Sequence, residues 1–152
     1  MSDPIGFRHT REVRRFVRAP RHRRVADPTA AVPLFEGLSR KERRFASQLL
    51  TTVAVPAGTL LAQEGTRGDE FFVVLEGTVE VYRGGAAIAT RGPGSPLGEI
   101  SLLEGGPRTA TLIAKTPVSI LVSSKQEFAS LLDSTPRIPE RLRAIAAERR
   151  AA

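Results

Sequence analysis

The 152-residue chain contains no cysteine and no tryptophan, and its two histidines, His9 and His22, lie near the N-terminus. The absence of cysteine excludes disulfides, thiolate nucleophiles and cysteine metal ligands. Because no histidine follows residue 22, the body of the chain cannot hold a Ser-His-Asp triad or a histidine-rich metal site. These absences predict a binding protein rather than an enzyme, with no catalytic residues, no metal and no cofactor.

Long apolar runs are also missing, and the apolar runs cover only a few residues, such as 120–122, with five at most in 71–75. No stretch is long enough to span a bilayer, and the N-terminus has no apolar run of signal-peptide length. The sequence therefore predicts a cytoplasmic protein without a transmembrane segment. Its length and its hydrophobic content of 41% fit one folded domain with attached tails.

The net charge of +7 is concentrated at the two ends of the chain. Residues 1–30 contain eight arginines and three carboxylates, and residues 136–152 contain five arginines and two carboxylates. These counts give +5 and +3, which leaves −1 for residues 31–135. A nucleic-acid-binding fold normally carries its basic stripe on the folded surface. We therefore expect the leader to be a solvated extension, with weak, non-specific contact to nucleic acid or an acidic surface as the alternative.

The distribution of charge and the spacing of apolar residues divide the chain into three parts. Residues 1–31 are predicted to form a basic, flexible leader, with a short helix over 10–19 and a linker over 26–33. Residues 32–123 are predicted to form a helix and a β-barrel, and residues 124–152 the C-terminal hinge and lid helices. Ser39 is the expected N-cap of the first helix, whose apolar face would consist of Phe45, Leu49 and Leu50.

Short segments with a period of two, separated by glycine turns, fill the middle of the chain. This pattern predicts a mainly β fold, an antiparallel β-barrel or jelly roll (double-stranded β-helix) with one N-terminal and two C-terminal helices. The second C-terminal helix would present Ile138, Leu142 and Ile145 on one side. The predicted strands cover residues 59–62, 70–75, 78–82, 86–90, 109–114 and 118–122.

The stretch 97–111, LGEISLLEGGPRTAT, carries the candidate chemistry. Gly98 permits a sharp turn, and residues 99–103 can form one helical turn whose free amides would hold an anion. The Gly105-Gly106-Pro107 sequence reverses the chain and would place Arg108 at the start of the next strand. A guanidinium beside free amides is a phosphate site in outline. Such loops also occur without a ligand, so the stretch alone leaves a structural role open.

Four motifs in order resemble the cyclic-nucleotide-binding domain family over about residues 32–145. LFEGLS is similar to the start of the family's first helix, and the next two motifs are similar to its paired barrel strands. The fourth resembles its phosphate-binding cassette, with glutamate and arginine spaced as in eukaryotic kinase regulatory subunits. The four motifs cover residues 34–39, 58–65, 68–81 and 98–110.

The resemblance implies specific roles for the cassette residues. Arg108 would pair with the equatorial phosphate oxygen, and Glu99 would accept a hydrogen bond from the ribose 2′-hydroxyl. Gly98 would lie against the ribose, where a side chain would collide with it. The neutral donors around the anion would be the main-chain amides of Ile100, Ser101 and Ala110.

The residues around the base give a weaker indication. A Thr109 hydroxyl could reach the base edge, and threonine there resembles the pattern of cyclic-GMP-selective members. Cyclic-AMP-binding bacterial members also carry serine or threonine at this place, and we expect cAMP to be preferred over cGMP. The family's usual phenylalanine before the cassette glycine is Leu97 here.

The leading hypothesis is a stand-alone sensor module of the bacterial type, which captures a 3′,5′-cyclic nucleotide and signals by rearranging its C-terminal helices. Leu142 and Ile145 are lid candidates, and simple packing on the barrel is the alternative. The chain beyond residue 148 is too short for a helix-turn-helix, so the expected partner is a protein in trans or a second copy. Two rivals are a ligand-free interaction module using the leader and a cupin-like enzyme, which the lack of histidine disfavours.

Overall fold

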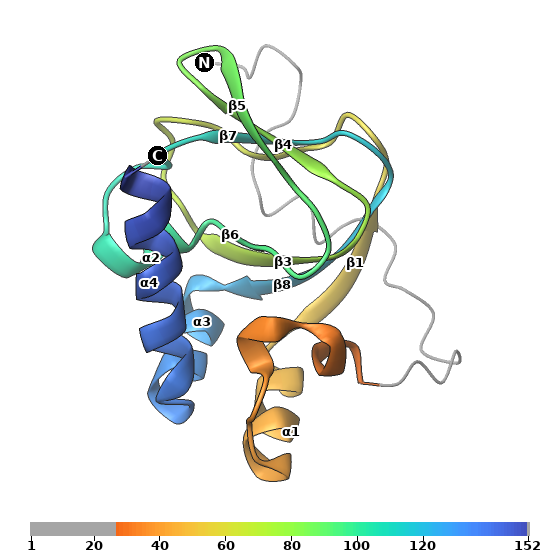
Figure 1. Cartoon of the computed structure of the whole chain (residues 1–152), viewed down its shortest axis with the longest axis vertical. Helices are drawn as coiled ribbons and strands as arrows, with labels where there is room; N and C mark the ends of the chain where they lie inside the picture. The colour runs from red at the N-terminus through yellow and green to blue at the C-terminus, as the bar shows by residue number, and fades with distance from the viewer. Residues whose placement is uncertain (1–26, 152) are drawn as a thin grey trace.

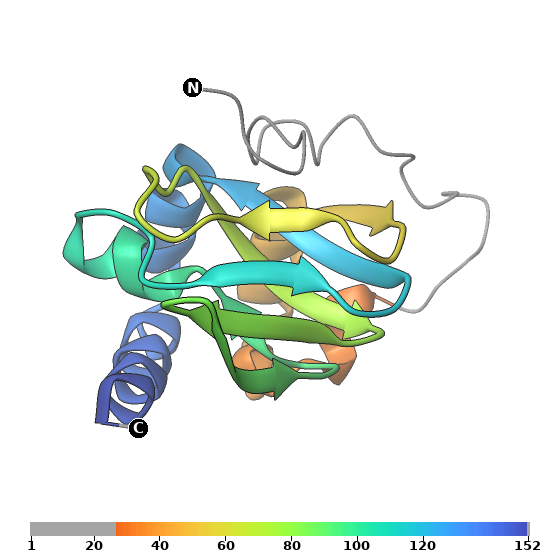
Figure 2. The same cartoon turned by 90° about the horizontal axis from the view of Figure 1, so that it is seen from above.

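The computed structural model describes residues 27–151 (Figure 1), and the helix predicted over 10–19 lies outside them. Two antiparallel sheets face one another, with strand orders β1-β8-β3-β6 and β2-β7-β4-β5. Figure 2 looks onto the second sheet, while helices cover the outer face of the first. The strands are β1 (Thr51–Val55), β2 (Leu60–Ala62), β3 (Glu70–Glu76), β4 (Val79–Arg83), β5 (Ala86–Arg91), β6 (Pro96–Leu97), β7 (Thr111–Ala114) and β8 (Val118–Ser124).

The helices precede, interrupt and follow the strands, so the jelly roll with one N-terminal and two C-terminal helices is confirmed. In place of the linker predicted over 26–33, the structure has two 3-10 helices. Asp27 caps the first, because its Oδ1 accepts from the Thr29 amide at 3.0 Å. The helices are η2 (Pro28–Ala31), η3 (Pro33–Phe35), α1 (Arg40–Gln48), α2 (Glu99–Glu104), α3 (Lys125–Ser134) and α4 (Arg137–Ala151).

The sheet that contains β3 separates two apolar cores. Phe72 and Val74 point between the sheets, whereas Phe71 and Val73 point toward the helices. The ring of Phe71 lies 4.7 Å from that of Phe128 on α3. Because side chains alternate along a strand, a strand covered on both faces is apolar throughout, which explains the run FFVVL in β3.

Helix α1 begins at the predicted N-cap. The Glu42 amide donates to Ser39 Oγ at 3.1 Å, and the Ser39 amide donates to Glu42 Oε1 at 2.9 Å. Ala46 and Leu50 are buried against the helical core. Phe45 is 37% exposed, so its assignment to the buried face is wrong. It precedes Ala46 by one residue, which rotates its side chain by about 100° around the helix axis.

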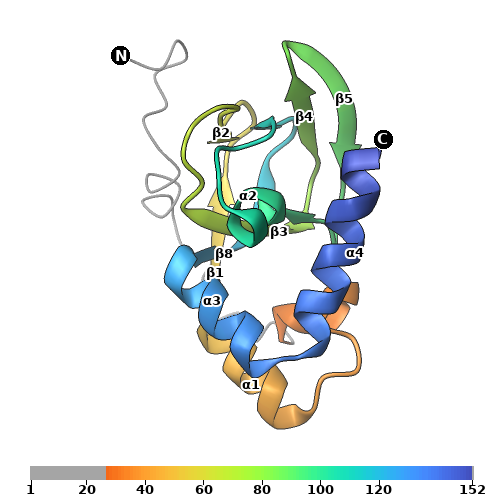
Figure 3. The ribbon, with the colours of Figure 1, turned by 90° about the vertical axis from the view of Figure 1, so that its left-hand side faces the viewer.

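The C-terminal arginines hold α4 to the fold rather than forming a basic tail. Arg137 donates to the Gly37 carbonyl at 2.8 Å, and Arg141 donates to the carbonyls of Leu34 at 2.9 Å and Glu36 at 2.7 Å. Leu142 is fully buried in the helical core, which favours its packing role over a lid. From there α4 rises past α2 toward β5 (Figure 3).

Candidate functional site

A pocket of about 210 Å³ opens between the first turn of α2, the β4–β5 wall and α4. Its position follows from the fold, because α2 interrupts the strands at the end of the barrel that α4 passes (Figure 3). The structure brings all seven predicted site residues to this one pocket, and their contacts with a nucleotide stay predictions. They are Gly98, Glu99, Ile100, Ser101, Arg108, Thr109 and Ala110.

Two main-chain hydrogen bonds hold the backbone of Arg108 in place. Its amide donates to the Thr66 carbonyl at 2.7 Å, and its carbonyl accepts from the Gly65 amide at 2.9 Å. Strand β7 begins only at Thr111, so the strand predicted from residue 109 starts two residues later, and Arg108 lies between the bridge residue Pro107 and the bend at 109–110. The side chain is turned inward and is only 4% exposed.

The guanidinium of Arg108 donates to three uncharged acceptors. Nη1 reaches the Gly98 carbonyl at 3.1 Å and Ser101 Oγ at 3.3 Å, and Nη2 reaches the Glu70 carbonyl at 2.6 Å. The group also lies over the Phe72 ring, with Cζ 5.8 Å from the ring centre. Its Nε is buried and has no hydrogen-bond acceptor among the described residues. These contacts orient the cation without neutralising it.

Burial holds the pKa of Arg108 below the ordinary arginine value, and the carboxylates of Glu70, Asp69 and Glu99 act in the opposite direction. An arginine remains charged at neutral pH despite such a shift. The depressed pKa therefore reports the cost of keeping a cation out of water. An anion entering the pocket would offset that cost.

Two glycines make room for this guanidinium. Gly98, the N-cap of α2, has φ +80°, and a Cβ there would lie 2.4 Å from Nη1 of Arg108 and 3.1 Å from the Glu70 carbonyl. A Cβ at Gly68 would lie 2.4 Å from Ser101 Oγ and 3.1 Å from Arg108 Cζ. A side chain at position 98 would thus collide with Arg108 itself, before any ribose is considered. Sequence reasoning did not identify Gly68 as part of the site.

Glu99 is held by the C-terminal helix. Its side chain is 1% exposed, and its Oε1 accepts from Arg149 Nη1 at 2.7 Å. The same Nη1 donates to the Pro96 carbonyl at 2.7 Å. A second ion pair joins Arg150 of α4 to Glu104 of α2. Helix α4 is therefore attached to the cassette at both ends of α2, and sequence reasoning missed Arg149.

Two more arginines, Arg83 and Arg91, line the pocket from β4 and β5. Arg83 Nε donates to the Thr109 carbonyl at 3.3 Å. Burial lowers the pKa of Arg91, and the nearby charge of Arg149 lowers it further. With Arg108, these guanidiniums outnumber the Glu99 carboxylate in the wall of the pocket, which favours an anionic ligand.

Comparison with known proteins gives the family. The family model of the cyclic nucleotide-binding domain matches residues 52–135. The chain belongs to the cyclic nucleotide-binding domain family. A cyclic nucleotide-gated potassium channel of Mesorhizobium japonicum is 40% identical over 123 residues, which are 81% of this chain and 34% of the channel. A cAMP-dependent protein kinase regulatory subunit of Yarrowia lipolytica is 37% identical over 103 residues, 66% of this chain and 28% of the subunit.

Among solved structures, the catabolite activator protein of Thermus thermophilus has a TM-score of 0.69 at 30% identity. The similarity covers 77% of this chain and 57% of that protein. The chain spans about a third of the length of the channel and the regulatory subunit. A cyclic nucleotide-binding domain is typically a regulatory, non-catalytic module.

The described residues contain neither a cluster of metal-binding side chains nor a membrane-spanning helix. Within residues 27–151, no group of three or more histidine, cysteine, aspartate or glutamate side chains is arranged to hold a metal ion. None of the helices in that part of the chain is both long enough and apolar enough to cross a bilayer.

Proposed function

We propose that this chain is a sensor module that captures a 3′,5′-cyclic nucleotide in the pocket between α2 and the barrel, with cAMP preferred over cGMP. The observation that carries the proposal is the inward guanidinium of Arg108, which is buried and oriented by neutral acceptors. A singly charged cyclic phosphate matches it in charge and in geometry. The amides of Ile100, Ser101 and Ala110 would add neutral donors to the same anion.

The sugar and base would then occupy the rest of the pocket. Glu99 uses one carboxylate oxygen for Arg149, which leaves the other free to accept from a ribose 2′-hydroxyl. Thr109 is exposed and lies in the pocket wall, where its hydroxyl could reach the base edge. Support for cAMP comes from relatives, such as the regulatory subunit named as cAMP-dependent.

Signalling would use the connection between the cassette and α4. Because Arg149 contacts Glu99 and Arg150 contacts Glu104, a shift of α2 on phosphate capture changes the contacts that hold α4. A ligand moves such an equilibrium only by its different affinity for the two positions of the helix. The output would pass to a protein partner in trans or to a second copy of the chain.

Calorimetric titration of the full chain with cAMP and with cGMP tests the proposal. We expect saturable binding of one nucleotide per chain, with the lower Kd for cAMP. A lower Kd for cGMP would reverse the base preference and leave the phosphate site intact. No heat with either nucleotide at millimolar concentration would favour the second candidate, a ligand-free interaction module, which rests on the +5 charge of residues 1–30.

A further inference from the structure

One face of α1 is exposed and has no role in the nucleotide pocket. Lys41, Arg44, Phe45 and Gln48 are all exposed, and their spacing of three, four and seven places them on one stripe of the helix. Phe45 and Ile88 are the large hydrophobic side chains exposed in the described part of the chain, at 37% and 48%. Ile88 of β5 lines the nucleotide pocket, whereas Phe45 belongs to α1, which lies at the opposite end of the molecule from β5 (Figure 1).

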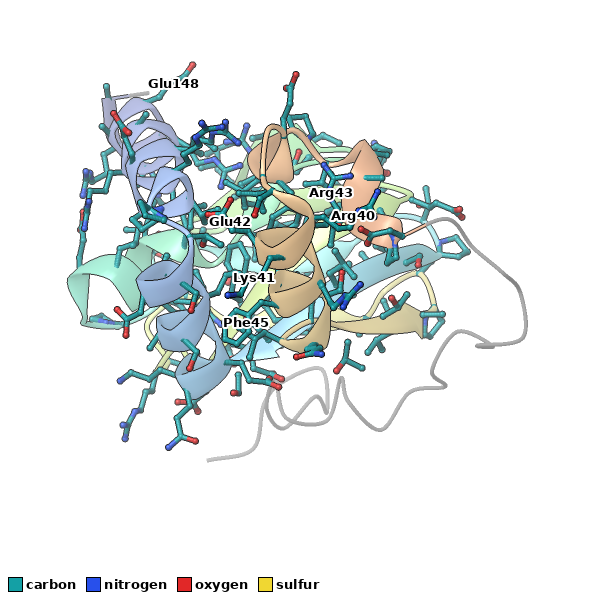
Figure 4. All side chains as sticks on the ribbon, turned by 90° about the horizontal axis from the view of Figure 1, so that it is seen from below. Arg40, Lys41, Glu42, Arg43, Phe45 and Glu148 are labelled. Atoms are coloured by element: carbon teal, nitrogen blue, oxygen red, sulfur yellow. The ribbon has the colours of Figure 1, made fainter. Side chains whose placement is uncertain are left out.

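The stripe forms one wall of a groove of about 540 Å³. Ser134, the last residue of α3, contributes the facing side, and Figure 4 shows Lys41, Glu42 and Phe45 on the side of α1 toward this groove. Phe45 thus lines an open, shallow groove between α1 and the end of α3. A concave site with an aromatic wall can bury one large apolar side chain of a partner.

The charge of the groove is positive. Four of the first five residues of α1, in the sequence RKERR, are basic. The one carboxylate among them, Glu42, also lines the groove and stays negatively charged, since its hydrogen bonds with Ser39 lower its pKa. The cations at 41 and 44 line the groove itself. With two cations against the one carboxylate of Glu42, the lining has a net charge of +1, and charge complementarity favours an acidic occupant.

We propose that this groove binds an acidic segment of a partner protein, which places one large apolar side chain beside Phe45. The chain's own leader, with +5 in residues 1–30, carries the same sign as the groove and would be repelled. A second copy meeting it through the same face would also oppose like charges. Duplex nucleic acid and anionic bilayers satisfy the charge, but neither offers a side chain to fill a groove between two helices.

The groove adjoins the connection to the helix that reaches the pocket. Ser134 precedes Thr135, which is buried and donates through its hydroxyl to the Leu131 carbonyl. Helix α4 begins two residues later and ends with Arg149 and Arg150 on the cassette. If α4 moves as proposed above, partner binding and nucleotide binding are thermodynamically linked. That linkage rests on the proposed function, but binding at the groove does not.

Selection of short random peptides displayed on phage, against the full chain without nucleotide, tests the groove directly. Phe45→Ala and Arg44→Glu chains serve for counter-selection, and Lys115→Glu, an exposed lysine in the β7–β8 loop, is the matched charge control. We expect the enriched peptides to be acidic and to contain an aromatic or large aliphatic residue. In fluorescence anisotropy, such a peptide should lose about tenfold or more in affinity with Phe45→Ala or Arg44→Glu and little with Lys115→Glu.

The proposal is overturned if no peptide is enriched, or if the enriched peptides are basic or neutral. It is also overturned if they bind Phe45→Ala as well as the parent. Tighter, Phe45-dependent binding of phosphatidylserine vesicles or duplex DNA would assign the groove to a different kind of partner. Cooperative thermal unfolding of Phe45→Ala, expected because Phe45 lies outside the buried helical core, excludes misfolding as the cause. Nucleotide titrations on the same variants test the proposed function separately.

Discussion

At the scale of single residues, the Arg108 guanidinium combines deep burial with acceptors that carry no charge. We expect Arg108→Ala to weaken cAMP binding by roughly 2 to 5 kcal/mol, which is about thirtyfold or more, because it removes a charge-assisted contact and leaves the phosphate unpaired. Isothermal calorimetry measures the change. Arg67→Ala is the matched control, since that arginine lies nearby with its side chain 79% exposed. Binding by Arg108→Ala as tight as that of the parent would refute the site.

Gly98 and Gly85 provide a matched pair that separates backbone strain from crowding of the site. Both have φ near +80°, but a Cβ at 98 lies 2.4 Å from Arg108 whereas nothing lies within 4 Å of one at 85. Each alanine substitution should lower the free energy of unfolding by about 1 to 2 kcal/mol through strain. Only Gly98→Ala should also reduce cAMP affinity, because it displaces the guanidinium. Equal affinities for both variants would show that the position of Arg108 does not matter.

At the scale of helices and strands, the contact between α4 and α2 can be tested through its ion pair. Arg149→Ala should weaken cAMP binding by about 1 to 3 kcal/mol, because Glu99 loses the donor that fixes it. Combined with Glu99→Gln, it should give a coupling energy of about 0.5 to 3 kcal/mol in a double-mutant cycle. Hydrogen exchange of residues 137–151 should change on cAMP addition in the parent and much less in Arg149→Ala. Additive effects of the two substitutions on binding, together with the same hydrogen exchange in the parent and in Arg149→Ala, would show that α4 is not coupled to the nucleotide.

The same elements show what the sequence can and cannot specify. Alternation and glycine turns located six of the eight strands, although β7 begins two residues later than predicted, and Ser39 located the start of α1. Strand β6 was not predicted, because it has only two residues and one of them is Pro96. The prediction that the Phe45 side chain lies on the buried face of α1 was wrong. Apolar spacing alone does not decide which of two adjacent residues faces the core when the position of the sheet is unknown. Arg149 could not be found, because its partner Glu99 is 50 residues away.

At the scale of the whole molecule, a ligand that binds only the folded chain must raise its stability by mass action. Free cAMP at about 100 times its Kd should add about 2.7 kcal/mol, which corresponds to roughly 5 to 15 °C in the unfolding midpoint for a domain of this size. Differential scanning calorimetry of the parent and of Arg108→Ala measures this. The shift should nearly disappear in the variant, and an equal shift in both would place the nucleotide elsewhere.

Strand β3 belongs to both apolar compartments at once, with Phe72 beneath Arg108 and the adjacent Phe71 against Phe128. Because the two faces of β3 pack against separate cores, we expect that the helical layer can be exchanged while the barrel keeps its shape. A chimera that grafts a relative's helical layer onto this barrel should fold, provided that the residues at 71, 73 and 121 are transplanted with it. One barrel could in this way carry different helical layers, each with its own response to the ligand.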